Sequence, residues 1–165
     1  MKGWCLKRII MCEATNNNIL TQATTQAFTK LINKVYMAFR QFMQQKFKAH
    51  NIDITFEMVQ VMGHLWHQDG VNQQEIANAI LKDKTSLTYL IDNLTRRNLV
   101  ERREDNLDRR NKLIFLTPEG RVLRETILVW INEMYALAGQ DISEKTLLEN
   151  MCILEKMYCN LKTIT

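Results

Sequence analysis

Residues 108–120 read DRRNKLIFLTPEG, and this stretch decides the fold. A charged segment gives way to a mostly apolar run, 112–116, which is too short for a helix and indicates a strand. Thr117 and Pro118 follow at once, and these residue types favour the N-cap and the first position of a helix. The stretch therefore predicts a strand that runs directly into a helix.

A matching strand and a series of helices are predicted before this junction. Residues 99–104 form the second strand, and a loop rich in charge, 105–111, joins it to 112–116. Apolar residues at helical spacing predict four earlier helices. The first helix covers about 19–48, with asparagines 16–18 as its cap, and the second follows Thr55 and stops near Gly70, its C-cap. The third covers 73–80, and the fourth covers 84–97 with Asn98 as a left-handed cap.

Two further helices are predicted after the junction. One runs from Pro118 to about Leu137 and ends at Gly139, and the other begins at Ser143 and carries apolar residues as far as Leu161. The first helix of the chain would span roughly 45 Å at ~1.5 Å per residue, which is more than a small domain needs. Surplus length of this kind suits an interface between subunits.

The composition agrees with a mostly helical protein. The 165 residues include one proline and five glycines, whereas an all-β chain would need more turn residues. No apolar run approaches the ~20 residues of a membrane span, and the start of the chain lacks a clear cleavage site for secretion. We therefore expect no membrane partner and a cytoplasmic location, with Met11 as an alternative natural start to Met1.

Charge is distributed unevenly along the chain. Residues 1–50 carry eight Lys and Arg against one acidic residue, and residues 84–112 carry eight against five, within a net charge of +4. Two basic zones can attract nucleic acid, although a solvated helix face would have a similar composition.

Two short helices, a tight turn and a β-hairpin in this order form a winged helix-turn-helix. The expected fold is mostly α with a small β-hairpin wing, and it has long N- and C-terminal helices for dimerisation. Its expected parts are an N-terminal tail, 1–17, a helical dimerisation region, 18–54 and 118–165, and a DNA-binding lobe, 55–117.

The second helix of the motif is expected to bind double-stranded DNA. Its apolar stripe holds it against the protein and leaves the opposite face free for the major groove. Hydroxyls on that face can meet base edges, the Tyr89 ring can contact a thymine methyl group, and the cations can neutralise phosphates. The alternative is a polar, solvated face, which most helices possess. The candidate residues are Lys84, Thr85, Ser86, Thr88, Tyr89 and Arg96, with Asn93 on the same face.

The charged loop supplies a second candidate contact. An arginine at the tip of a hairpin can enter the minor groove, where the local negative potential attracts it. We expect Arg110 to do so, while Asp108 orients it by a charge-assisted hydrogen bond and Arg109 reaches phosphate or sugar. An ordinary solvated turn is the alternative.

These residues resemble the MarR (multiple antibiotic resistance regulator) family. Residues 108–120 are similar to its signature, an Asp-x-Arg wing that runs into a Leu-Thr-x-x-Gly strand-to-helix junction. Upstream, the segments similar to its helix-turn-helix are 73–77, 83–94 and 99–102. The resemblance covers about 55–125, and the remaining helices match in order and length only. Tyr89 stands where the family often has arginine, and Asn98 stands where it usually has glycine.

The resemblance implies an obligate two-fold homodimer, joined through its first and last helices, on a pseudo-palindromic operator near its own gene. It implies transcriptional regulation, often repression that ends when a small aromatic or phenolic effector binds between the dimer region and the DNA lobes. Two alternatives stay open. One is a regulator that senses thiol oxidation through Cys12, and the other is a winged-helix protein-interaction module without DNA binding.

Histidines and catalytic motifs give weaker signals. His64 and His67 lie one turn apart and His50 precedes them, but a closed zinc site needs four ligands, so we expect no metal and no cofactor. The sequence has no nucleophile elbow, no phosphate-binding glycine loop and no zinc-protease motif, so we expect no enzyme.

Cysteines and large aromatic residues are further candidates. Cys152 and Cys159 lie seven residues apart on one predicted helix face and suit a dimer core. Trp66, Trp130 and Tyr135 suit either the core or an effector crevice.

Overall fold

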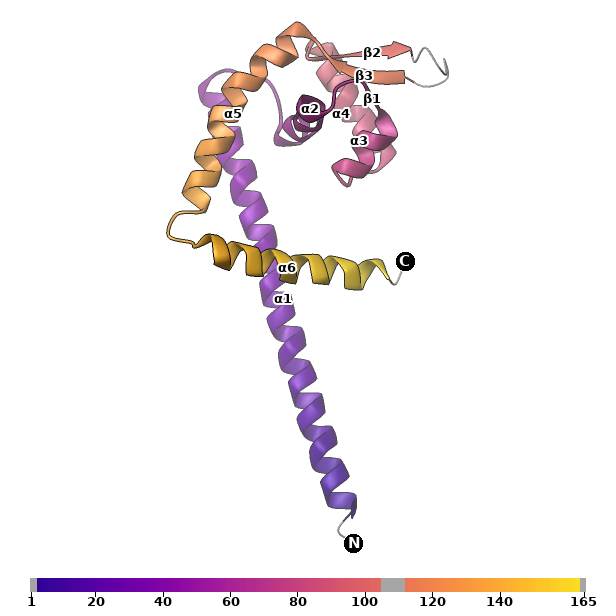
Figure 1. The fold of residues 1–165 in the computed structure, drawn as a ribbon, viewed down its shortest axis with the longest axis vertical. Coiled ribbons are helices and arrows are strands. Elements are labelled where there is room, and N and C mark those ends of the chain that lie inside the picture. Colours follow the sequence, from indigo (N-terminus) through magenta and orange to yellow (C-terminus); the bar gives the residue numbers. More distant parts are fainter. Residues whose placement is uncertain (1–2, 105–111, 164–165) are drawn as a thin grey trace. The chain divides into compact units, whose positions relative to one another are not determined.

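The computed structural model of this protein describes residues 3–104 and 112–163, with side chains from residue 21 onward. The described residues form a mostly helical winged helix-turn-helix, which confirms the predicted fold class (Figure 1). Two compact units, 1–51 and 52–165, divide the chain. In chain order the elements are α1 (Gly3–Ala49), α2 (Phe56–His67), β1 (Val71–Asn72), α3 (Gln73–Ala79), α4 (Lys84–Arg96), β2 (Val100–Glu104), β3 (Lys112–Leu116), α5 (Pro118–Ala138) and α6 (Glu144–Lys162).

Helix α1 begins earlier than predicted. Asparagines 16–18, the predicted cap, lie within a helix that starts at Gly3, so the predicted start at Ile19 is wrong. The chain has neither glycine nor proline from residue 4 to residue 62. An asparagine inside a helix costs less than ~1 kcal/mol relative to alanine, so these three do not end it.

Helix α2 begins where the sequence predicts. The Thr55 hydroxyl accepts a hydrogen bond from the Met58 amide at 3.3 Å and so caps the helix. The helix ends at His67 with Gln68 as its C-cap, so the predicted cap at Gly70 is wrong. Gly70 has a φ of +75°, and a Cβ there would lie 2.5 Å from the Phe115 ring. Glycine suits this position because its φ is positive and because the ring of Phe115 occupies the space that a Cβ would need.

The sheet is antiparallel in the order β1-β3-β2, and it includes one strand that the sequence did not predict. Val71 of β1 pairs with Ile114, and Val100 of β2 pairs with Leu116. The two residues of β1 are too few to show an alternating pattern. The predicted strand 112–116 is confirmed, and the second strand starts one residue later than predicted.

The step from β3 into α5 is a tight joint, which we call the wing junction and which comprises Asn98, Leu99, Thr117 and Gly120. The Thr117 hydroxyl donates to the Asn98 carbonyl at 2.6 Å and accepts from the Gly120 amide at 3.1 Å. A Cβ at Gly120 would overlap the carbonyl oxygen of Leu99. Asn98 has a φ of 56°, the predicted left-handed cap. Thr117 and Gly120 of the Leu-Thr-x-x-Gly motif therefore hold helix, turn and strand together.

The last two helices differ in what they bury. Helix α5 buries Ile127, Trp130 and Met134, whereas α6 buries none of its 19 residues. As predicted, Gly139 is the C-cap of α5 and Ser143 is the N-cap of α6. No helix in 3–104 or 112–163 is both long and apolar enough to span a membrane.

Candidate nucleic-acid interface

Helix α4 is anchored to the protein by one side. Leu87, Leu90, Ile91 and Leu94 are buried on that side, and the helix packs against α2, α3 and β2. Its N-terminus is capped by Asp83, whose carboxylate accepts from the Ser86 amide at 2.8 Å. The apolar stripe therefore determines which side of α4 faces outward.

The outward side carries the residues that the sequence singled out. Lys84, Thr85, Ser86 and Arg96 are exposed, and Thr88 is half-buried. Tyr89 has 65% of its surface exposed, although it is a large aromatic residue. The structure thus brings these six candidates onto one helix, with the aromatic ring between the two terminal cations.

Two of the hydroxyl groups on this side, those of Ser86 and Thr88, already donate within the protein. Ser86 Oγ donates to Asp83 Oδ2 at 2.6 Å, and Thr88 Oγ1 donates to the Lys84 carbonyl at 2.8 Å. The bond from the Ser86 hydroxyl, together with the Ser86 amide, lowers the pKa of the Asp83 carboxyl below its ordinary value. The carboxylate is therefore ionised at neutral pH and accepts the proton of the Ser86 hydroxyl.

Asn93, which the sequence placed on the free face, is buried with 6% exposed, and that prediction is wrong. It lies between Leu90 and Leu94 on the helix, at the edge of the apolar stripe. Its amide donates to the Tyr89 carbonyl at 2.8 Å, and its oxygen accepts from Arg96 Nη2 at 2.8 Å. Asn93 therefore positions the Arg96 guanidinium.

The C-terminal end of α4 is tied to the chain that precedes α2. Arg97, the C-cap residue, donates through Nε to the Asp53 carbonyl at 2.5 Å and through Nη2 to the Asp53 carboxylate at 2.7 Å. On the neighbouring strand, Arg102 pairs with Asp92 of α4 at 2.6 Å. Both links hold α4 in place, and neither arginine was singled out by the sequence pattern.

The base of the wing is ordered by an aromatic residue and a carboxylate. The Arg103 guanidinium lies 4.5 Å from the centre of the Phe115 ring, and Asp69 accepts from the Leu116 amide. Asp108, Arg109 and Arg110 lie outside the described residues, so the roles predicted for them stay predictions.

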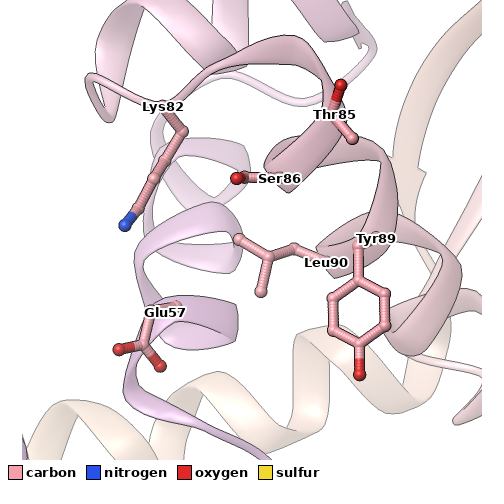
Figure 2. A pocket seen from close by; sticks show the side chains of 6 residues that line it. All are labelled: Glu57, Lys82, Thr85, Ser86, Tyr89 and Leu90. Atoms are coloured by element: carbon pink, nitrogen blue, oxygen red, sulfur yellow. The ribbon is translucent and has the colours of Figure 1, made fainter.

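A hollow of about 450 Å³ opens beside the outward side of α4 (Figure 2). Leu90 is buried behind it, and its wall is mostly apolar although Lys82 and Glu57 lie at its sides. The sequence did not predict this hollow, because α2 and α4 meet only in the folded chain. The lining residues are Glu57, Lys82, Thr85, Ser86, Tyr89 and Leu90.

The remaining candidates are dispersed. The part of the chain that the structure describes holds no group of three side chains suited to a metal ion. Trp130 is buried and Tyr135 is exposed, while Cys152 and Cys159 are exposed free thiols. The side chain of Cys12 is outside the described part.

The chain is similar to known proteins both in sequence and in structure. The family model described as the MarR family matches residues 55–112. The crystal structure of the S. aureus MepR–DNA complex is 30% identical, with a TM-score of 0.73 over 80% of this chain and 96% of that one. The chain belongs to the MarR family. Members of this family are DNA-binding transcriptional regulators and not enzymes.

One curated sequence and one further solved structure are also similar to this chain. The HTH-type transcriptional regulator TtmR of Methylorubrum extorquens (strain PA1) is 29% identical over 74% of this chain, and the match spans 64% of TtmR, just under two thirds of its length. The transcriptional regulator SlyA has a TM-score of 0.74 over 81% of this chain and 93% of that one. At 22% identity, SlyA supports the fold alone.

Proposed function

We propose that this MarR-family chain is a sequence-specific regulator that binds double-stranded DNA in the cytoplasm, with α4 in the major groove and the β2–β3 hairpin in the minor groove. The outward side of α4 carries the proposal. An aromatic ring with 65% exposure lies among hydroxyl groups on a helix whose other side is buried. The major groove offers methyl groups and hydrogen-bonding edges to such a surface.

Each candidate residue has a role in this proposal. Lys84 and Arg96 bind phosphates near the two ends of α4, while Thr85, Ser86, Thr88 and Tyr89 face the base edges. Arg110 enters the minor groove with Asp108 as its orienter, and Arg109 binds phosphate or sugar.

We propose that the DNA-binding form is a homodimer on a pseudo-palindromic operator. Helix α6 exposes a row of apolar side chains and buries none of its residues, and so large an apolar surface suits a partner. A second copy offers the same surface under two-fold symmetry, and such dimers bind symmetric half-sites. A stable monomer by light scattering would contradict this role. The exposed residues of α6 include Leu147, Leu148, Met151, Leu154, Tyr158 and Leu161.

We propose that the regulator is a repressor and that a small aromatic effector releases it from DNA. Trp66 Nε1 and His64 Nε2 are buried on α2 without a hydrogen-bond partner among the described residues. Such orphaned atoms are rare in folded proteins. The two residues are two positions apart and so face different sides of α2, and a hydrogen-bonding ligand would satisfy one of them. DNA release by phenols and aromatic carboxylates supports this mode. Release by peroxide that is lost in Cys12→Ser supports thiol sensing in its place.

Fluorescence anisotropy with the DNA upstream of the protein's own gene, against random DNA, tests the central proposal. Promoter-selective binding that weakens steeply with added salt is expected, because bound phosphates release counterions. Absence of binding to either DNA at low salt would favour the protein-interaction module.

A further inference from the structure

The outward side of α4 also indicates which base pairs it selects, and this inference rests on the DNA-binding function proposed above. A hydroxyl group has one proton to donate, and those of Ser86 and Thr88 are engaged by Asp83 and by the Lys84 carbonyl. The bond to Asp83 is charge-assisted and therefore the harder one to exchange. Towards DNA, both oxygens are acceptors.

Acceptors distinguish the bases in the major groove. Adenine presents its N6 amine and cytosine its N4 amine as donors, whereas guanine presents two acceptors and is usually bound by arginine or lysine. Arg96 is three turns further along the helix from Ser86 and already donates to Asn93. The two acceptor hydroxyls thus favour adenine or cytosine.

Tyr89 and the hollow beside it decide between these two bases. Ser86 and Tyr89 are three residues apart and are neighbours on the surface of α4. Their contacts therefore fall on one base pair or on adjacent ones. The hollow between them is mostly apolar and backed by Leu90 (Figure 2). Thymine, the partner of adenine, carries the methyl group that suits such a surface, and guanine, the partner of cytosine, does not.

We infer that α4 selects A·T base pairs at its contact positions, with Ser86 Oγ accepting from the adenine N6 amine and with Tyr89 and the hollow receiving the thymine methyl group. The ring of Tyr89, not its hydroxyl, supplies the apolar contact. Tyr89 is therefore a specificity-determining residue of α4.

Selection from a library of random DNA duplexes tests this inference. The wild type is expected to enrich A·T pairs at the positions where Ser86→Ala changes the preference. In the selected duplex, deoxyuridine in place of thymine removes only the methyl group and should weaken binding about fourfold per buried methyl. Inosine·cytosine in place of A·T keeps the minor groove of A·T but presents the major groove of G·C, and should weaken binding roughly 5- to 100-fold.

Substitutions at Tyr89 separate the ring from the hydroxyl. Tyr89→Phe should still discriminate thymine from deoxyuridine, whereas Tyr89→Ala should bind both duplexes equally. Thr95→Ala, an exposed position of α4 away from the hollow, is the matched control and should keep the wild-type preference.

The outcomes separate this inference from the function on which it rests. Enrichment of G·C at the positions that depend on Ser86, or equal affinity of the wild type for thymine and deoxyuridine duplexes, overturns the base preference and leaves DNA binding in place. A wild type that enriches no sequence and binds no duplex at low salt overturns both.

Discussion

The carboxylate of Asp69 accepts a hydrogen bond of 2.9 Å from the backbone amide of Leu116, 47 residues further along the chain. The same oxygen accepts from the Gly70 amide, and the other oxygen pairs with Arg121 of α5. One half-buried side chain thus joins the loop after α2 to the end of β3 and to α5. The orientation of the wing depends on this joint.

We expect Asp69→Ala to destabilise the protein by about 1–3 kcal/mol, because the Leu116 amide would lose its partner in a partly buried place. Urea unfolding measures the change. Arg121→Gln is the matched control and should cost at most about 1 kcal/mol, since the Arg121 side of this ion pair is exposed to solvent. Equal losses in the two variants would mean that the ion pair, and not the amide bond, is the stabilising contact.

Gly120→Ala should destabilise the protein by roughly 1–3 kcal/mol, the usual cost of overpacking. The new Cβ would overlap the backbone carbonyl of Leu99, and a backbone atom cannot turn aside as a side chain can. Gly63→Ala is the control in α2, where no atom lies within 4 Å of an added Cβ. That change should stabilise the protein by about 0.5–1 kcal/mol because it removes a glycine from a helix interior. A neutral Gly120→Ala variant would contradict the close approach at the wing junction.

The stability contributed by Asp83 should disappear in acid. Hydrogen bonds from Ser86 lower the pKa of Asp83 in the folded protein below its ordinary value of 3.8. The unfolded chain therefore binds the proton more readily, and the contribution is present above that value and is lost as the pH falls through the folded pKa. Between about pH 5 and about pH 2, the free energy of unfolding should fall more steeply for the wild type than for Asp83→Asn. Parallel curves would speak against the bond between Ser86 and Asp83.

Arg110→Ala should weaken operator binding by roughly 1–3 kcal/mol at constant salt. Arg110→Ala removes a positive charge together with its predicted contacts in the minor groove. Arg124→Ala is the control, because it removes an exposed positive charge from α5, in a different part of the chain. Anisotropy titrations of both variants provide the measurement. If Arg124→Ala lowers the affinity as much as Arg110→Ala does, the effect belongs to net charge and the wing is not a specific contact.

The local features of the fold could be predicted from the sequence. Thr55, Thr117 and Ser143 are N-caps as expected, because a cap depends on residues three positions apart. Strand β3 has its predicted bounds because an apolar run between a charged loop and a proline leaves little choice.

Features that depend on tertiary contact could not be predicted in the same way. Asparagine is a residue type that is mostly exposed, and Asn93 is buried only because it lies at the edge of the apolar stripe of α4. The hollow beside Tyr89 forms because Glu57 of α2 lies near Ser86 of α4. The sequence pattern of each helix says nothing about the distance between the two helices. The helix start predicted at asparagines 16–18 is wrong because a residue that suits a cap is also tolerated inside a helix.

The wing junction has a consequence for the inheritance of the family signature. Thr117 and Gly120 make contacts within the protein, to the carbonyls of Asn98 and Leu99, and selection on them acts through folding. A descendant gene that drifts at Ser86 and Tyr89 and abandons its operator would still need both residues to fold. The motif by which the family is recognised therefore reports the fold, whereas in the function proposed above the DNA sequence that is bound depends on α4.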